Sequence, residues 1–333
     1  MSRRSWLLLG LLSALWGASY LFIKVALEDD MSPTVIVFVR TALAALVLLP
    51  LAARAGALGG LRQNLGPILV LAFVQMGGPL LLIAAGEREI SSSLTGILVA
   101  TAPIFTFLLA FALEGEERAS GLSLAGVAIG IAGVALLLGI DAGGGAGALV
   151  GGLMIVLASF GYGVGGWFVK RRVRGVQPMA MVGATAATVA VAMAPFAALG
   201  APSHAPDLAA TGSLLALGVL CTGLAFVIFY SLVASDGPAK ASLVGYIAPG
   251  FSIVYGITLL DEGFTAATAA GLVLILAGSW LAAEGRAPWV PRSAASGELA
   301  AGGVDVAPAG KADGGADPAL LEGRPEGGDR VPA

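Results

Sequence analysis

The sequence predicts an all-α integral membrane protein with ten transmembrane helices, arranged as two inverted repeats of five helices. Hydrophobic residues make up 57% of the 333 residues and charged residues only 12%, and the mean hydropathy is +0.92. A soluble domain carries about 25% charged residues, so this chain cannot cover its surface with polar groups in water. Long apolar stretches recur along the chain, and the pattern of the first half returns in the second.

A helix that crosses the hydrocarbon core needs about 20 apolar residues. Short breaks marked by Gly, Pro, Asp or charge clusters separate ten such stretches. Helix is the expected element because a spanning segment must satisfy its own backbone groups, and the stretches lack the alternation of a barrel strand. The predicted spans are Trp6–Ala26, Pro33–Ala53, Leu65–Ala85, Ser92–Leu113, Leu122–Ile140, Leu149–Val169, Pro178–Leu199, Thr211–Val233, Ala239–Leu260 and Thr265–Ala283.

The first apolar run follows Arg3 and Arg4, as the run of a signal peptide would. It continues from Trp6 to Ala26 and has no clean small-x-small cleavage site, whereas a signal peptide has an apolar region of about 7–15 residues. We therefore expect a retained first transmembrane helix.

The two halves share residues at an offset of 145 or 146 positions. Five spans per repeat is an odd number, so the second repeat must enter the membrane upside down, as in inverted-repeat transporters. We expect residues 1–145 and 146–284 to form the two repeats. The recurring residues include Ser13, Gly17, Phe22 and Lys24, which return as Ser159, Gly163, Phe168 and Lys170, and Ala102, Pro103, Phe105, Glu116, Gly126 and Gly133, which return as Ala248, Pro249, Phe251, Glu262, Gly271 and Gly278.

Basic residues predict the orientation. If the N-terminus is inside, the outer connections hold only Arg88, with Lys24 at a helix end, and the acidic clusters around Asp30 and Glu262 fall outside. This positive-inside bias predicts a multi-pass protein of the cell inner membrane with both termini in the cytoplasm. The cytoplasmic connections then hold Arg3, Arg4, Arg54, Arg62, Arg118, Arg171, Arg172, Arg174, Lys240, Arg286 and Arg292.

The composition changes abruptly near Glu284 to Gly, Ala, Pro and scattered charge. This segment has too few aliphatic or aromatic residues to bury a core. We expect residues 285–333 to form a disordered cytoplasmic tail.

Several function classes lack their residues. A net charge of -3 without a basic stripe indicates no nucleic-acid partner. The single cysteine, Cys221, rules out an intrachain disulfide framework and a thiolate metal cage. No Walker lysine loop, metal-ligand cluster or Ser-His-Asp set is present, so we expect no cofactor, no metal and no enzymatic activity. The acidic residues near the spans all fall at helix ends, which leaves no evident intramembrane carboxylate for proton coupling: Glu87, Glu89, Glu116 and Glu262.

Aromatic residues within the spans are candidate binding groups. Trp16, Tyr20 and Lys24 follow one another at intervals of four and share one helical face. Tyr162 occupies the equivalent of Trp16, with Trp167 nearby. An aromatic belt explains such residues at the membrane interface, but Trp16 and Tyr162 lie near mid-span. They either line a cavity or pack in the core.

Polar residues within the spans are the second set of candidates. Arg40 lies about two turns inside its span. An intramembrane charge marks a functional site by default, although an arginine that snorkels or pins helices is the alternative. Gln75, near mid-span, either joins helices or binds substrate. Candidates of the same sort are Thr101, Thr222, Tyr230 and Tyr246, and Pro79, Pro103 and Pro249 either expose helix carbonyls to a cavity or simply kink their helices.

The sequence Trp16-Gly17-Ala18-Ser19, Lys24 in the first span, Arg40 in the second, and Ala102-Pro103 followed by Glu116 resemble the EamA-type family of the drug/metabolite transporter superfamily. The resemblance covers about residues 5–284. It implies a ten-helix inner-membrane carrier that exports amino acids, related metabolites or drugs. This sequence departs from the family where Tyr162 replaces a tryptophan and Thr185 an arginine. The family's central cavity maps here to Trp16, Tyr20, Gln75, Thr101, Tyr162, Trp167, Thr222 and Tyr246, with Lys24 and Arg40 as charged or gating residues.

These observations together predict a secondary-active transporter that exports small amphipathic metabolites by alternating access between two inverted repeats. Its expected partners are a small-molecule substrate and the lipid bilayer, and a homodimer stays open. The alternative is a structural or receptor-like membrane protein, which would show no substrate-dependent flux in vesicles. A membrane-embedded enzyme would need acids, histidines or serines clustered at one depth, and the sequence offers none.

The orientation can be tested with reporter fusions. Fusions after Gly115 and Arg174 should report the cytoplasm, and fusions after Asp30 and Gly263 should report the exterior, because basic connections stay inside. Reversed signals at either pair would contradict the orientation.

The tail can be tested by truncation near Pro288. The shortened chain should insert into the membrane and transport substrate as the full chain does, because the removed residues cannot bury a core. Loss of insertion or of transport would show that the tail is needed.

Overall fold

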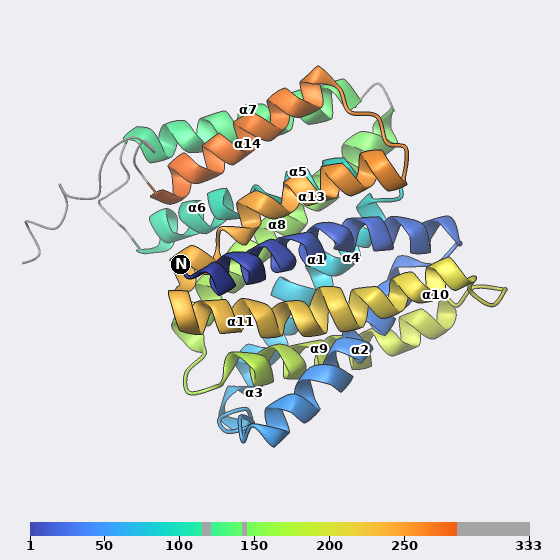
Figure 1. Cartoon of the computed structure of the whole chain (residues 1–333), viewed down its shortest axis with the longest axis vertical. Coiled ribbons are helices and arrows are strands. Elements are labelled where there is room, and N and C mark those ends of the chain that lie inside the picture. Colours follow the sequence, from blue (N-terminus) through green and yellow to red (C-terminus); the bar gives the residue numbers. More distant parts are fainter. Residues whose placement is uncertain (115–120, 142–144, 285–333) are drawn as a thin grey trace, which may run out of the picture. The chain divides into compact units, whose positions relative to one another are not determined.

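Long helices run back and forth beside one another in the computed structural model (Figure 1). The structure describes residues 1–114, 121–141 and 145–284. The chain divides into two units, Met1–Pro288 and Trp289–Ala333. The predicted tail, the truncation point at Pro288 and the motif residue Glu116 lie outside the described residues.

The first half of the chain forms five helical stretches, and two of these are divided into shorter helices. In chain order its elements are α1 (Arg3–Glu28), α2 (Pro33–Arg54), the short 3-10 helix η1 (Arg62–Asn64), α3 (Leu65–Leu71), the π-helix η2 (Ala72–Gly77), α4 (Gly78–Gly86), α5 (Ser92–Val99), α6 (Ala102–Glu114) and α7 (Gly121–Asp141).

The second half repeats this order. Its elements are α8 (Ala146–Arg172), α9 (Pro178–Leu199), α10 (Leu208–Leu215), the π-helix η4 (Ala216–Leu224), α11 (Ala225–Asp236), α12 (Pro238–Ala241), α13 (Val244–Leu259) and α14 (Ala266–Glu284).

The predicted all-α membrane fold is confirmed. Nine helical stretches in the described part of the chain are long and apolar enough to cross a membrane, and Val244–Leu259 is a shorter apolar helix. That shorter helix begins later than the predicted span Ala239–Leu260, because α12 and a turn at residues 242–243 precede it. The first half has a matching interruption, where residues 100–101 separate α5 from α6.

Local sequence explains where the helices begin and end. The Ser32 hydroxyl accepts a hydrogen bond from the Val35 N–H at the start of α2, and Pro33 occupies its first turn. The Asp207 carboxylate caps α10 by accepting from the Ala210 N–H. Gly237, with a φ of 89°, ends α11 in a conformation that other residues rarely adopt.

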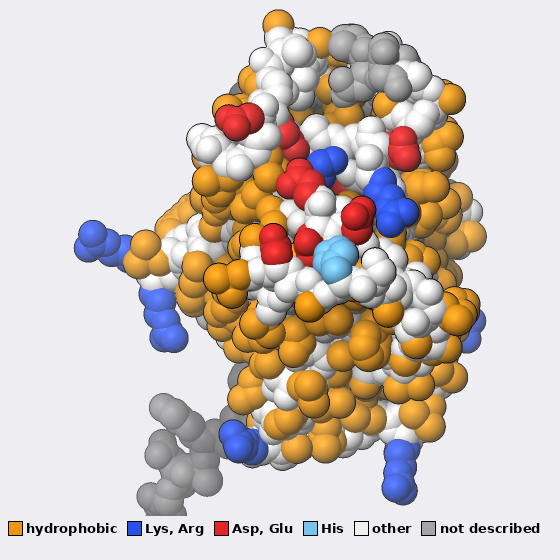
Figure 2. Space-filling model, turned by 90° about the vertical axis from the view of Figure 1, so that its right-hand side faces the viewer, with side chains coloured by type: hydrophobic (Ala, Val, Ile, Leu, Met, Phe, Trp, Pro, Cys, Tyr) orange, Lys and Arg blue, Asp and Glu red, His pale blue; other side chains and the backbone are white. Residues whose placement is uncertain are grey.

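Acidic residues gather on one side of the described bundle. We call this the acidic side; it carries the ends of α1, α4 and α13 and the beginnings of α2, α5 and α14. It is the right-hand side of Figure 1 and faces the viewer in Figure 2, where red acidic side chains cluster. The Asp207 N–H donates to the Asp29 carboxylate there at 3.1 Å. We call the opposite side, which carries Arg3, Arg54 and Arg172, the basic side.

Helices of the two halves approach closely at glycine. A Cβ added to Gly278 of α14 would lie 2.5 Å from the Gly130 nitrogen and 2.6 Å from the Gly126 carbonyl oxygen of α7. A Cβ at Gly17 of α1 would lie 2.6 Å from the Cβ of Phe251 in α13. Small residues let helices in lipid approach until their backbones touch. Glycine is therefore required at these contacts.

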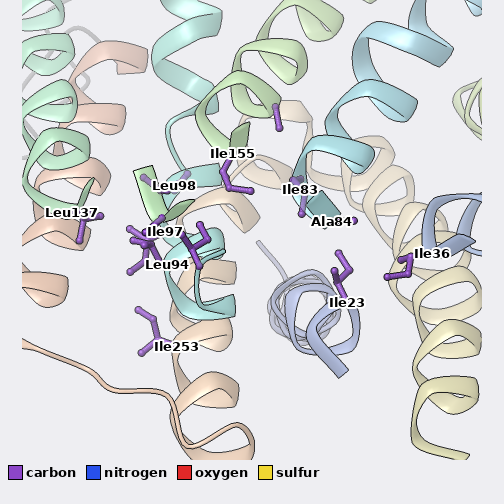
Figure 3. Close-up of a cluster of buried hydrophobic side chains, with 14 of the residues drawn as sticks. Ile23, Ile36, Ile83, Ala84, Leu94, Ile97, Leu98, Leu137, Ile155 and Ile253 are labelled. Atoms are coloured by element: carbon purple, nitrogen blue, oxygen red, sulfur yellow. The ribbon is translucent and has the colours of Figure 1, made fainter. Parts of the chain in front are cut away.

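Apolar side chains from both halves fill the interior of this unit (Figure 3). Ile23 of α1 and Ile83 of α4 belong to the same buried cluster as Ile155 of α8 and Ile253 of α13. Tyr20 of α1 and Tyr162 of α8 pack against this cluster.

The glycine contact between α7 and α14 can be tested by substitution. Gly278→Ala should lower the thermal unfolding temperature, since the new methyl group meets backbone that cannot move aside, and such overpacking costs about 1–3 kcal/mol. The control is Gly139→Ala in α7, where nothing lies within 4 Å of the added Cβ. The control should be neutral or stabilising, because alanine favours helix by about 1 kcal/mol. Equal effects of the two changes would contradict the contact.

Candidate functional site

Arg40 of α2 lies in the interior, where its side chain contacts α1 and η4. Its side chain is 8% exposed. Its Nε donates to the Thr222 hydroxyl at 2.8 Å, and its Nη2 donates to the Ser19 hydroxyl at 3.3 Å. No carboxylate within residues 1–114, 121–141 and 145–284 forms an ion pair with it. Arg40 is therefore a buried cation that neutral hydroxyls hold in place.

Thr222, which is 2% exposed, belongs to the π-helix η4. Its hydroxyl accepts from Arg40 and donates to the Leu217 carbonyl at 2.8 Å, five residues earlier. The wider π-helical turn exposes that carbonyl to the side chain, and such turns are frequent at functional sites. The predicted residue Thr222 therefore orients Arg40.

Two tyrosines lie close to Arg40. Tyr20 of α1 is within electrostatic range of Tyr162, Glu87 and Arg40, and Tyr162 of α8 is within range of Arg40. Both side chains are half-buried. Gly96 of α5 makes room for Tyr20, because a Cβ there would lie 3.3 Å from the tyrosine ring. The predicted residues Tyr20, Tyr162 and Arg40, on three different helices, thus lie within electrostatic range of one another.

Lys24 binds the end of α4 on the acidic side. Its Nζ donates to the backbone carbonyls of Glu87 at 2.8 Å and Ile90 at 3.2 Å. These carbonyls lack partners within the helix, and a cation there also interacts favourably with the helix dipole. Lys24 therefore joins α1 to the turn between α4 and α5.

Glu262 binds the beginning of α5 in the complementary way. Its carboxylate accepts from the N–H groups of Ser92 at 2.6 Å and Ser93 at 2.9 Å, and from the Ser93 hydroxyl at 2.5 Å. An anion at a helix N-terminus is stabilised by the free N–H groups and the dipole. This contact explains the position of Glu262 in the repeated motif as a link between the two halves.

Glu87 is the residue that the sequence reasoning missed. It lies at a helix end, as expected, but its side chain is 0% exposed and neither carboxylate oxygen has a hydrogen-bond partner. Glu89, two residues later, is exposed. Nothing in the sequence Glu87-Arg88-Glu89 separates the buried acid from the exposed one, because neighbouring helices decide which is covered.

The surroundings of Glu87 favour its neutral form. The residue follows the membrane-spanning stretch Arg62–Gly86. Burial raises the pKa of its carboxyl well above the ordinary value, Lys24 lowers the pKa, Glu262 raises it and Arg40 lowers it. Burial dominates because the charged form loses its hydration without gaining a hydrogen bond.

Gln75 lies in the π-helix η2, at the equivalent place to Cys221 in η4. Its side chain packs against Gly165 of α8, where an added Cβ would lie 2.5 Å from the Gln75 Cβ. The amide is half-buried and makes no hydrogen bond within the part of the chain that the structure describes. Gln75 thus has polar atoms available beside Tyr162's helix.

Trp16 of α1 packs against a group of aromatic residues on α11. Its ring centroid lies 5.8 Å from that of Phe226 and 5.5 Å from that of Phe229, and Phe226 stacks on Tyr230 at 6.0 Å. Trp16 is half-buried. It therefore packs against aromatic neighbours while part of its surface stays accessible.

Thr101 lies at the break between α5 and α6 and is 2% exposed. Its hydroxyl donates to the Leu98 carbonyl at 2.7 Å, and the Ser159 hydroxyl of α8 donates to the same carbonyl at 3.2 Å. Ser279 of α14 donates to the Ala100 carbonyl at 2.7 Å. Hydroxyl groups thus satisfy the carbonyls that the break before Pro103 frees, which favours a structural kink there.

Trp167 and Tyr246 each contact residues outside the predicted set. Trp167, nearer the basic end of α8, has the Arg171 guanidinium 5.6 Å from its ring centroid. It lines an open hollow of about 660 Å³ together with Lys170, Arg171, Arg172 and Arg174. The Tyr246 ring lies 5.8 Å from that of Trp280 in α14. Of the predicted set, Thr222 contacts Arg40 directly, and Tyr20 and Tyr162 lie within its electrostatic range.

The sequence of this chain matches the EamA-like transporter family over residues 4–139 and again over residues 149–283. A solved crystal structure with 22% identity superposes with a TM-score of 0.60, over 84% of this chain and 97% of the other, which shows a shared fold.

Curated relatives are similar over most of their length. An uncharacterized transporter of Archaeoglobus fulgidus is 23% identical over 85% of this chain and 100% of its own. The uncharacterized inner membrane transporter YedA of Escherichia coli is 27% identical over 74% and 80%. A probable amino-acid metabolite efflux pump of E. coli is 25% identical over 84% and 95%. This chain is a multi-pass membrane transporter, not an enzyme, and it belongs to the EamA-like transporter family.

Proposed function

We propose that this transporter exports small amphipathic metabolites that carry a carboxylate, such as amino acids, by alternating access between two inverted repeats. The observation that carries the substrate class is the buried Arg40 guanidinium, which has hydroxyl partners but no ion-pair partner in the described residues. The naming of an E. coli relative as a probable amino-acid metabolite efflux pump supports the same class.

The chemistry of Arg40 suits a carboxylate. A guanidinium has five N–H donors, and the contacts to Thr222 and Ser19 use two of its nitrogens. A substrate carboxylate could accept two parallel hydrogen bonds and supply the missing negative charge. Tyr162 and Trp16 would provide aromatic walls, and the unpaired Gln75 amide would bind a polar substrate group.

Reciprocal contacts between the halves support an inverted repeat. Gly17 packs on Phe251, and Gly163 packs on Phe105, at distances of 2.6 and 2.9 Å from an added Cβ. Both residues of the second contact are related to those of the first by an offset of 146. Each half thus places its first helix on the other half, as a pseudo-two-fold axis would require. The family match over two separate stretches, residues 4–139 and 149–283, supports the same division.

The distribution of charge supports the proposed orientation. His204 lies on the acidic side, within electrostatic range of three acidic residues: Asp29, Asp30 and Asp207 (Figure 2). Arg54, Arg62 and Arg172 belong to the basic side. The positive-inside rule then puts the basic side in the cytoplasm of a cell inner membrane, with both termini on that side.

The binding site can be tested by substituting its proposed lining residues. The substrate is first identified by comparing the metabolites that cells with and without the protein release. Gln75→Ala should then raise the apparent Kd about 3- to 10-fold, the effect of one lost hydrogen bond, with normal expression and insertion. Trp16→Ala should impair both transport and expression, because it also removes a bulky packing group.

The matched control is Gln177→Ala, which changes an exposed glutamine before α9. It should leave transport unchanged. Normal substrate binding by a triple variant of Trp16, Gln75 and Tyr162 in liposomes would refute the assigned site. Absence of any substrate-dependent flux would instead support the structural or receptor-like alternative.

A further inference from the structure

The turn between α4 and α5 is the most heavily linked point on the acidic side. Lys24 of α1 holds the Glu87 and Ile90 carbonyls, and Glu262, beyond the end of α13, holds the N–H groups of Ser92 and Ser93. Residues from both halves therefore form hydrogen bonds to one short turn. Any opening of the bundle on this side must break some of these contacts.

Glu87 lies in this turn, and its side chain forms no hydrogen bond within the described residues. Both carboxylate oxygens and the nearby Ser92 hydroxyl are buried and have no hydrogen-bond partner. The charged groups within range are Lys24 on α1, Arg40 on α2 and Glu262 beyond α13, and Tyr20 is the adjacent phenol. Tyr162 of α8 lies within electrostatic range of Tyr20. No cation among the described residues forms an ion pair with Glu87.

A carboxylate that is buried without a hydrogen-bond partner is strongly unfavourable in a low-dielectric interior, and such a group takes up a proton instead. We propose that the Glu87 side chain is a proton-binding site, occupied when the acidic side is closed and linked to the opening of that side. This inference rests on the proposed alternating access, because a static bundle would never expose the group.

Opening changes the balance of charges at Glu87. Separation of α1 from the α4–α5 turn breaks the two Lys24 hydrogen bonds and admits water. The carboxyl can then ionise, with the freed Lys24 ammonium as its counter-ion. The closed form consequently binds the proton more tightly than the open form.

The sign of the pH dependence follows from this difference. Below the ordinary glutamate pKa both forms carry the proton, and pH has no effect through Glu87. Between that value and the raised pKa of the buried group, rising pH deprotonates the open form first and shifts the population towards it. Alkaline conditions should therefore favour opening of the acidic side, and acid should favour closure.

The protonation of Glu87 can be measured without any substrate. Purified protein in lipid nanodiscs is compared with Glu87→Gln by infrared difference spectroscopy at neutral pH. The wild type should show the carbonyl band of a protonated carboxylic acid that Glu87→Gln lacks. The control Glu89→Gln, which changes the exposed acid two residues away, should keep the band. Absence of the band from the wild type, or its loss in Glu89→Gln, would overturn the proposal.

The stability of Glu87→Gln gives a second readout. The amide copies the neutral carboxylic acid in shape, so the variant should fold and should unfold at a temperature equal to or above that of the wild type at pH 8. Wild-type stability should fall as pH rises above the ordinary glutamate pKa, and the Glu87-dependent part of that fall should vanish in the variant. A variant that fails to fold would show that the charged form is the structural one, and would overturn the proposal.

The link to opening is measured by cysteine labelling in a Cys221→Ala background. Ser92→Cys places a thiol at a buried position whose hydroxyl has no partner, and Ser203→Cys, at an exposed position, corrects for thiol ionisation. The ratio of the two labelling rates with a membrane-impermeant maleimide should rise with pH and become independent of pH after Glu87→Gln.

The proposed link between Glu87 and opening would be refuted by a labelling-rate ratio that is independent of pH when Glu87 is present. It would also be refuted by a ratio that still changes with pH after Glu87→Gln. None of the three measurements needs a substrate. A wrong substrate class or export direction would therefore leave these results intact and would appear only as absent flux in the transport assay.

Discussion

Glycine lets several helices of the first half approach those of the second closely, and the rest of the structure depends on this close approach. Lipid chains are as apolar as leucine, so helices in a membrane associate through packing and hydrogen bonds. Gly17 brings α1 onto α13, Gly163 brings α8 onto α6, and Gly278 brings α14 onto α7. Because α1 lies so close to the second half, its face with Ser19, Tyr20 and Lys24 stands opposite α2 and the α4–α5 turn.

Polar groups brought into this interior are satisfied by short, local means. Ser159, Ser279 and Thr101 donate to the carbonyls freed by the break between α5 and α6. Lys24 and Glu262 satisfy the two helix ends that meet at the α4–α5 turn. Each contact supplies a partner to a backbone group that has none within its own helix. Against this background, the buried charged residue Arg40 has no ion-pair partner and the buried Glu87 side chain has no hydrogen bond within the described residues, and charged residues left in this way are typical of functional positions.

Arg40 and Glu87 connect the proposed binding site to the proposed opening of the acidic side. Tyr20 is within electrostatic range of both Arg40 and Glu87, so a carboxylate bound at Arg40 and a charge formed at Glu87 would repel each other across one aromatic side chain. Low dielectric strengthens such an interaction. Substrate binding and proton release at the acidic side would then oppose each other, and a neutral Glu87 would favour a loaded, closed transporter.

The sequence by itself determined the fold class, the number and approximate bounds of the spans, and the family, because transfer of a 20-residue apolar segment into lipid depends only on that segment. It also identified Arg40, Tyr20 and Tyr162 as candidates, since charge and aromatic residues in a span are visible without partners. Only the tertiary structure decided that the Ser159 and Ser279 hydroxyls satisfy the carbonyls at the break next to Thr101, that Tyr246 packs near Trp280, and that Glu87 rather than Glu89 is buried. Those outcomes depend on which distant helix covers each face, and no local property of the chain contains that information.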